Sequence, residues 1–198
     1  KIEVINGFGK VKPGKSVEVT ATDGSKKTYT AAHIILATGA RSRELPNLKQ
    51  DGKNIIGYRE AMSLPEQPKS MVVVGSGAIG VEFAYFYNAM GTKVTVVEFM
   101  PNIVPVEDEE VSKQLERSLK KVGIEIMTNS SVESVTVSGG TCSVKIKSAK
   151  GESVITCEKV LSAVGITTNI ENIGLEECGI ITDKGKVVVN DFYQTNIP

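Results

Sequence analysis

The chain has 198 residues, 40% of them hydrophobic, and its 23 basic side chains are balanced by 23 acidic ones. This length accommodates one or two domains with a substantial hydrophobic core. No basic cluster indicates binding to nucleic acid or an anionic membrane, and no hydrophobic run approaches the roughly 20 residues of a membrane span. We therefore expect neither nucleic acid nor a membrane as a partner.

Three cysteines and one histidine bear on possible metal or redox chemistry. Cys142, Cys157 and Cys178 are far apart and match neither a metal-ligand pattern nor a C-x-x-C pair, so we expect buried or half-buried thiols in a reducing compartment. His33 has no visible partner cluster, which favours a solvated or capping role over that of a ligand or general base. No metal site is expected, and no catalytic residue is assigned.

The first third of the chain changes character twice. Residues 1–31 alternate between hydrophobic and polar and are interrupted by turn signals, which predicts an antiparallel meander whose first strand covers residues 1–5. Residues 33–39 form a continuous hydrophobic run, typical of a strand buried on both faces of a parallel sheet. Residues 41–68 carry three prolines and little periodicity. They predict a connection between domains, with a short helix around residues 59–62.

The most informative stretch is a hydrophobic strand at residues 71–74 that leads into Gly75, Gly77 and Gly80 and then a helix. This G-x-G-x-x-G spacing after a strand predicts a dinucleotide-binding turn. The first glycine would permit the tight turn, the second would let a pyrophosphate approach the backbone, and the third would let the helix pack on the strand. The helix N-terminus would offer free N–H groups to the phosphates.

A second hydrophobic strand, residues 93–97, ends at Glu98, where a carboxylate is expected to accept hydrogen bonds from the adenosine ribose. The negative charge would repel a 2′-phosphate, and the following residues 99–101 include no arginine. We therefore expect NAD(H) rather than NADP(H). The alternative interpretation is a plain glycine turn beside a surface glutamate.

The remaining pattern predicts the rest of an α/β domain. The first helix should bury a stripe, namely Ile79, Phe83, Phe86 and Met90. A second helix, from Asp108 to Gly123, should bury another stripe, namely Val111, Leu115, Leu119 and Val122. A strand at residues 124–127, antiparallel strands within 132–156 and a buried strand at 159–165 follow. The fold class is thus α/β, a Rossmann-like domain whose parallel sheet is crossed by a β-meander in place of a third helix.

A repeat extends this organisation to the start of the chain. Residues 33–39 resemble residues 159–165, and a meander precedes each run. Two such units predict two nucleotide-binding folds, but only the second has its glycine turn within the chain. The first turn would fall before residue 1, so we expect a piece of a longer polypeptide that holds incomplete portions of the first fold.

Five segments, in this order and spacing, resemble the flavin-dependent pyridine nucleotide–disulfide oxidoreductases. They are residues 37–40, 74–82, 96–98, 163–165 and 194–198. Within this family the chain is most similar to the dihydrolipoamide dehydrogenases, through residues 6–10, 79–82 and 172–176. The resemblance implies three parts: a partial FAD-binding domain (1–67), an NAD-binding domain (68–168) and a return segment of the FAD-binding domain (169–198).

The resemblance also implies the residues at each cofactor. Those around NAD(H) are Gly75, Ser76, Gly77, Ala78, Ile79, Gly80, Val81, Glu82, Glu98, Val132 and Gly165. Those against FAD are Gly9, Thr38, Gly39 and Ala40. Glu82 would lie near the nicotinamide amide, or would simply be an acid favourably placed on the helix dipole. After Gly165 the chain departs from the family, which usually has two arginines and a proline before Asn169, and this puts the domain-contact electrostatics in doubt.

Such enzymes oxidise protein-bound dihydrolipoamide and pass electrons through an active-site disulfide and FAD to NAD+. The resemblance implies a homodimeric parent in a bacterial cytoplasm or mitochondrial matrix, with lipoyl-bearing proteins of 2-oxoacid dehydrogenase or glycine cleavage complexes as partners. The redox cysteines and the catalytic histidine would lie outside this chain, and FAD would be held only by the full-length parent. The alternatives are another flavin disulfide reductase or NADH oxidase of the same fold, or a non-catalytic NADH-binding module.

Overall fold

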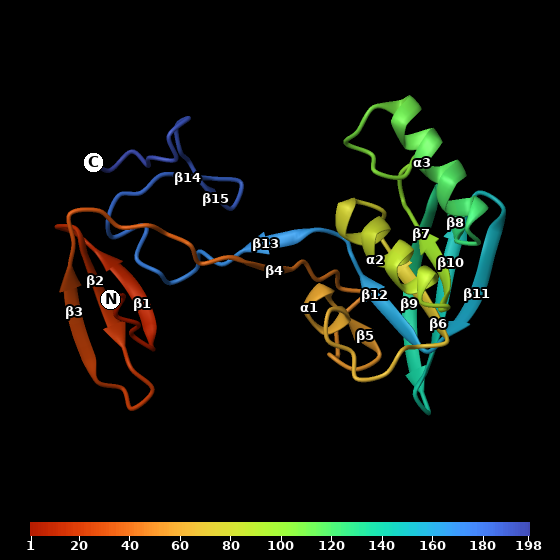
Figure 1. Ribbon diagram of the computed structural model, residues 1–198, viewed down its shortest axis with the longest axis horizontal. Helices are drawn as coiled ribbons and strands as arrows, with labels where there is room; N and C mark the ends of the chain where they lie inside the picture. The colour runs from red at the N-terminus through yellow and green to blue at the C-terminus, as the bar shows by residue number, and fades with distance from the viewer. The chain divides into compact units, whose positions relative to one another are not determined.

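A computed structural model describes all of residues 1–198 and divides them into two compact units (Figure 1). Unit 1 comprises residues 1–41 and 167–198, and unit 2 comprises residues 42–166. The chain passes between them through β4 (Ala40–Ser42) and β13 (Ile166–Thr168). The sequence-based boundary after residue 67 differs from this division, because β5 (Ile55–Ile56) pairs with β12 (Lys159–Ser162) in the sheet of unit 2.

Unit 2 is built on a five-stranded parallel sheet with the order β5-β12-β6-β7-β8. Its other three strands are β6 (Ser70–Val74), β7 (Lys93–Val97) and β8 (Glu125–Met127). The chain runs from β6 outward to β7 and β8 and then returns to β12 on the opposite side of β6. The strand order therefore reverses between β6 and β12, and ligands of open α/β sheets bind at the carboxyl ends of strands at such a point.

The two faces of the sheet are covered by different layers (Figure 1). Met71 and Val73 pack in one core cluster with α2 (Ala78–Ala89) and α3 (Glu109–Lys121). Val72 and Val74 pack in a second cluster with a three-stranded antiparallel meander. Its strands are β9 (Ser130–Ser138), β10 (Thr141–Ser148) and β11 (Gly151–Cys157). Burial on both faces explains the unbroken hydrophobic run of β6. The mixed α/β class with a parallel sheet and a meander crossover is confirmed.

The helices of unit 2 form where the sequence predicts them. Asp108 caps α3 by accepting hydrogen bonds from the N–H groups of Glu110 and Val111. Gly123, at φ 96°, ends that helix. The short helix around residues 59–62 is present as α1 (Tyr58–Ala61).

The predicted buried stripes of these helices are correct only in part. Leu119 is buried and Leu115 half-buried, but Val111 and Val122 are 57% and 50% exposed. On α2, Ile79 and Phe83 are half-buried against the core, but Phe86 and the following Met90 are exposed, and the fully buried residues are Gly80, Val81, Ala84 and Tyr87. Gly80 and Ala84 have little or no side chain, so the backbone of α2 can lie close to the sheet on their side. That side is therefore the buried face of the helix.

Unit 1 contains the predicted antiparallel meander, made of β1 (Phe8–Lys12), β2 (Ser16–Thr20) and β3 (Lys26–Thr30). Its first strand begins at Phe8, and the predicted strand at residues 1–5 is wrong, since Ile2 is 94% exposed and unpaired in any sheet. Two short strands, β14 (Thr182–Asp183) and β15 (Lys186–Val187), form a hairpin.

The predicted buried strand at residues 33–39 is also wrong. These residues form no strand, and Ile35 is 89% exposed. A hydrophobic run becomes a buried strand only when neighbouring strands supply hydrogen-bond partners and another layer covers it. Unit 1 offers this run no parallel neighbour. The similar run at residues 159–165 has such neighbours on both sides and forms β12.

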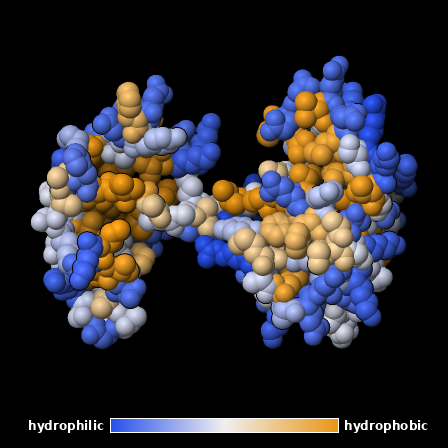
Figure 2. Space-filling model, viewed as in Figure 1, coloured by the Kyte–Doolittle hydropathy of each residue, from blue (hydrophilic) through white to orange (hydrophobic).

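Hydrophobic surface remains on both units (Figure 2). On unit 2 it includes Tyr85 and Phe86 of α2 and the following Met90, each more than half exposed. On unit 1 it includes Phe192 and Tyr193, which are 82% and 86% exposed. None of the helices is long and hydrophobic enough to cross a membrane.

The burial of the cysteines leads to a labelling prediction. Cys142 and Cys157 lie opposite each other on β10 and β11, and burial raises the pKa of Cys142 and raises that of Cys157 to about 12. Both thiols therefore stay protonated and unreactive at pH 8. With a thiol-specific disulfide reagent, we expect only the half-buried Cys178 to react in the native protein and all three cysteines after unfolding. Cys178→Ser should remove the native signal, and rapid native labelling of that variant would contradict the structure.

Candidate functional site

The glycine turn lies at the point where the strand order reverses. Gly75 directly follows β6, and its N–H donates to the Val97 carbonyl of β7 at 2.9 Å. On the other side, the Ala163 N–H, directly after β12, donates to the Val74 carbonyl at 2.8 Å. The carboxyl ends of β6, β7 and β12 are thereby held together around the turn.

Gly75 and Gly80 are required by close backbone contacts. Gly75 has a φ of +95°, and a Cβ there would lie 2.5 Å from the Ala163 carbonyl oxygen. A Cβ on Gly80 would lie 2.0 Å from the Gly75 carbonyl oxygen. These contacts agree with the expected roles of the first and third glycines, since they produce a tight turn and a close approach of α2.

Gly77 differs because the space around it is open. It precedes α2 with a φ of −65°, and a Cβ there would meet no atom within 4 Å. No side chain caps this helix end, and its first turn contains no acidic residue. The backbone N–H groups at the start of α2 are therefore available to an anion, and a phosphate could approach them without steric conflict.

The other predicted residues of this turn have distinct environments. Ala78 and Glu82 are exposed on α2, and Ile79 is half-buried. Val81 packs in the core beneath the helix, so its side chain supports the helix and faces away from solvent. Ser76 is completely buried.

Glu98 is only 7% exposed and points to the glycine turn. Its Oε2 accepts hydrogen bonds from the Ser76 N–H at 2.8 Å and from Ser76 Oγ at 2.6 Å. Its Oε1 accepts one from the Met100 N–H at 2.7 Å. A carboxylate is tolerated in such a buried place only with donors of this kind. The interpretation of Glu98 as a plain surface glutamate is therefore wrong.

Sequence reasoning did not find the contact between Ser76 and Glu98. The signal was a hydroxyl residue in the second position of the glycine motif, which can donate where an alanine or glycine cannot. Spacing alone does not reveal that contact, because it depends on how the turns after β6 and β7 meet.

Two further predicted residues border the sheet in unit 2. Val132 is buried at the start of β9, and its carbonyl accepts a hydrogen bond from Asn47 Nδ2 at 2.6 Å. Gly165 is exposed, with a φ of +109° and open space at its Cβ position. It follows β12, so it lies at the same sheet edge as the glycine turn.

The four predicted flavin residues all lie in unit 1. Gly9 is exposed on β1, and the turn at Thr38 and Gly39 is tied to Asn169, whose N–H and Nδ2 donate to the carbonyls of Gly39 and Thr38 at 3.0 and 3.1 Å. Ala40 begins β4. Unit 1 contains no helix.

An ion pair lies where the chain departs from the family pattern. Arg41 donates to the carboxylate of Glu171 at 2.6 Å and to Asn169 Oδ1 at 2.9 Å. This guanidinium lowers the pKa of Glu171 to about 2. His33, for which a solvated role was predicted, is exposed in the same unit.

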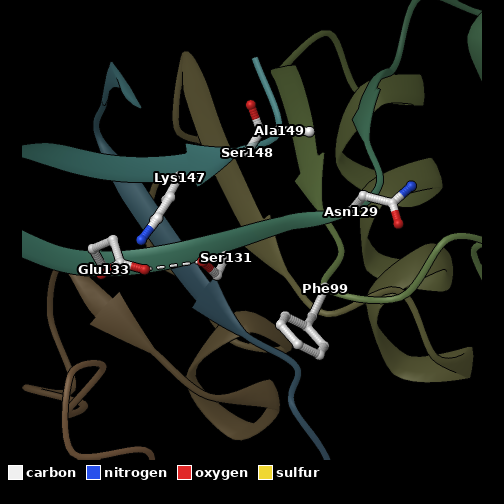
Figure 3. Close-up of a pocket in the computed structure, with 7 residues that line it drawn as sticks. All are labelled: Phe99, Asn129, Ser131, Glu133, Lys147, Ser148 and Ala149. Carbon is white, nitrogen blue, oxygen red and sulfur yellow. Dashed lines mark hydrogen bonds between the residues drawn. The ribbon is translucent and has the colours of Figure 1, made fainter. Parts of the chain in front are cut away.

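A shallow hollow of about 520 Å³ opens on unit 2 (Figure 3). It is lined by Phe99, Asn129, Ser131, Glu133, Lys147, Ser148 and Ala149. Lys147 extends from β10 toward β9, where Ser131 Oγ donates to Glu133 Oε1 at 2.9 Å. None of the predicted site residues lines this hollow, although Phe99 directly follows Glu98.

Comparison with known proteins supplies an independent line of evidence. Residues 1–198 match the family described as pyridine nucleotide-disulphide oxidoreductase. The dihydrolipoyl dehydrogenase of Zymomonas mobilis is 42% identical over 200 residues, covering 100% of this chain and 42% of that protein. The dihydrolipoyl dehydrogenase of Rhizobium etli is 48% identical over 171 residues, covering 86% of this chain and 36% of that protein.

Solved structures agree on the fold. LpdA from Mycobacterium tuberculosis superimposes with a TM-score of 0.82 at 31% identity, covering 96% of this chain and 42% of that one. The HOCl-induced flavoprotein disulfide reductase RclA from Escherichia coli gives a TM-score of 0.82 at 24% identity, covering 98% of this chain and 43% of that one. At the latter identity the likeness extends to the fold alone. The chain spans less than half the length of these relatives.

The glycine contacts predict different effects of two alanine substitutions on stability. Gly80→Ala should lower the free energy of unfolding by about 1–3 kcal/mol, because the new Cβ would overlap the Gly75 carbonyl. Gly77→Ala should change it by less than about 1 kcal/mol, because the space is open and the loss of chain entropy in the unfolded state offsets the weaker preference for alanine at a helix N-cap. Urea unfolding of both variants measures the difference, and equal stabilities would contradict the tight packing at Gly80.

Proposed function

Because this chain belongs to the pyridine nucleotide-disulphide oxidoreductase family, we propose that unit 2 binds NAD(H) at the carboxyl ends of β6, β7 and β12. The family uses a pyridine nucleotide together with FAD. The observation that carries the proposal is the open, uncapped start of α2 at Gly77, beside the buried acid Glu98. An anion site next to a ribose acceptor is the pattern that a dinucleotide requires.

Each part of the site has a separate task in this proposal. The N–H groups at the start of α2 would hold the pyrophosphate, and Gly77 would leave room for it. Glu98 would accept a hydrogen bond from the adenosine ribose. Val132, Gly165 and Glu82 would border the rest of the dinucleotide. When bound, NAD supplies a nicotinamide ring that accepts or releases a hydride.

The same residues favour NAD(H) over NADP(H). A 2′-phosphate would bring negative charge against the carboxylate of Glu98, which is buried and therefore weakly screened. Residues 99–101 contain no arginine that could compensate for this repulsion.

For the whole protein we propose dihydrolipoyl dehydrogenase activity, the name carried by relatives at 42% and 48% identity. In that protein unit 1 would belong to the FAD-binding domain, with Gly9, Thr38, Gly39 and Ala40 supplying part of the flavin contacts and other residues supplying the rest. Its partners would be lipoyl-bearing proteins of 2-oxoacid dehydrogenase or glycine cleavage complexes, and the protein would act as a homodimer in the cytoplasm or the mitochondrial matrix.

Calorimetric titration with NADH and NADPH tests the proposal on the chain itself. We expect NADH to bind at least about tenfold more tightly than NADPH, because the acid repels the 2′-phosphate. Gly77→Ala should weaken NADH binding by about tenfold or more while leaving the fold intact, since its Cβ fills the space that the pyrophosphate needs. Ser118→Ala, on the exposed part of α3, serves as the control. Equal affinity for both nucleotides, or no effect of Gly77→Ala, would count against the site.

A further inference from the structure

We propose that Ser76 is the positioning residue of this site: it clamps Oε2 of Glu98, so that the acid presents a single free acceptor position, on Oε1, to one ribose hydroxyl. This inference rests on the proposed binding of NAD(H) and adds how the nucleotide is read. Its basis is the hydrogen bonding of a buried carboxylate with three protein donors.

The acceptor positions of Glu98 are unequally occupied. A carboxylate has about four lone-pair positions, two on each oxygen. The N–H and the Oγ of Ser76 take both positions on Oε2, at 2.8 and 2.6 Å. The Met100 N–H takes one position on Oε1, at 2.7 Å. One position on Oε1 is left for a ligand.

Ser76 is itself held in place. It is 0% exposed, so its hydroxyl has no water to turn to, and Glu98 is the acceptor within reach. Its carbonyl oxygen accepts a hydrogen bond from the Val104 N–H at 2.9 Å. Val104 has a φ of +40°, a strained conformation for a β-branched residue, and its neighbour Ile103 is fully buried. Ser76 is thus held by Glu98 through its N–H and hydroxyl and by Val104 through its carbonyl, so it keeps the Glu98 carboxylate in one orientation.

Removing the hydroxyl should release the acid without emptying the site. In Ser76→Ala the N–H bond to Oε2 remains, but the second position on Oε2 becomes free and the carboxylate can rotate. The carboxylate of the wild type, which has one free position, should distinguish between the two hydroxyls of the adenosine ribose. The carboxylate of Ser76→Ala should not. A residue that only supports the fold would not change this preference.

The first arm of the test measures calorimetric affinities for NADH and for its analogues lacking the 2′- or the 3′-hydroxyl of the adenosine ribose. For the wild type, we expect one analogue to bind about tenfold more weakly than NADH and the other within about threefold. For Ser76→Ala, we expect NADH to bind about three- to tenfold more weakly and the two analogues to differ by less than about threefold. Ser118→Ala is the matched control and should behave like the wild type.

The second arm is a double-mutant cycle with Glu98→Ala, which removes both side-chain oxygens that Ser76 and the ribose would contact. If Ser76 acts through the acid, Ser76→Ala should have no further effect on NADH affinity in the Glu98→Ala background. Equal losses in both backgrounds would overturn the inference. If Glu98→Ala does not fold, the analogue arm decides alone, since it needs only the wild type and Ser76→Ala.

The outcomes separate the two proposals. A wild type that binds NADH but loses affinity equally for both analogues overturns the clamp and leaves the nucleotide site standing. A Ser76→Ala variant that keeps the wild-type preference does the same. A wild type that does not bind NADH overturns the proposed function, and with it the role given to Ser76.

Discussion

The carboxylate of Glu98 lies almost fully buried at the end of β7, where it accepts hydrogen bonds from the turn after β6 and from its own following loop. Burial of an ionised carboxylate is strongly unfavourable unless donors replace its lost water, and three donors do so here. The same bonds join two loops that are separate in sequence. The geometry of the glycine turn and the orientation of the acid are therefore parts of one arrangement.

Gly75 and Gly80 allow the loops to pack closely at the point where the strand order reverses. The Gly75 carbonyl lies where a Cβ on residue 80 would be, and the Ala163 carbonyl lies where a Cβ on residue 75 would be. The loops after β6 and β12 are thus in backbone contact, and so are the loop after β6 and the first turn of α2. Only Gly77 is left with open space, and it stands at the uncapped end of the helix. Close packing around two glycines leaves the third open to a ligand.

The glycine turn lies at the carboxyl edge of a parallel sheet whose two faces are both covered. Alternate residues of β6 enter two different cores, one under the helices and one under the meander. The meander replaces a third helix and returns the chain to β12, next to β6. That return brings Gly165 to the edge that carries the glycine turn. Unit 1 lacks such a two-sided core, and of its hydrophobic run at residues 33–39 only Ile34 and Leu36 are half-buried, while Ile35 is exposed.

The sequence by itself determined the α/β class, the elements of unit 2 other than β5, the glycine turn and the position of the acid after β7. These features depend on local patterns: hydrophobic runs, helix caps and glycine spacing act over a few residues. The family also followed from segments in the right order.

Only the tertiary structure decided which faces of α2 and α3 are buried, whether residues 33–39 and 159–165 both become strands, and what the Glu98 carboxylate contacts. Each of these outcomes depends on neighbours distant in the chain. The buried face of α2 differs from the predicted one because Gly80 packs against the Gly75 carbonyl. Residues 33–39 form no strand because no parallel strand lies beside them. Ser76 reaches Glu98 because β6 and β7 lie side by side, a contact that spacing along the chain does not encode.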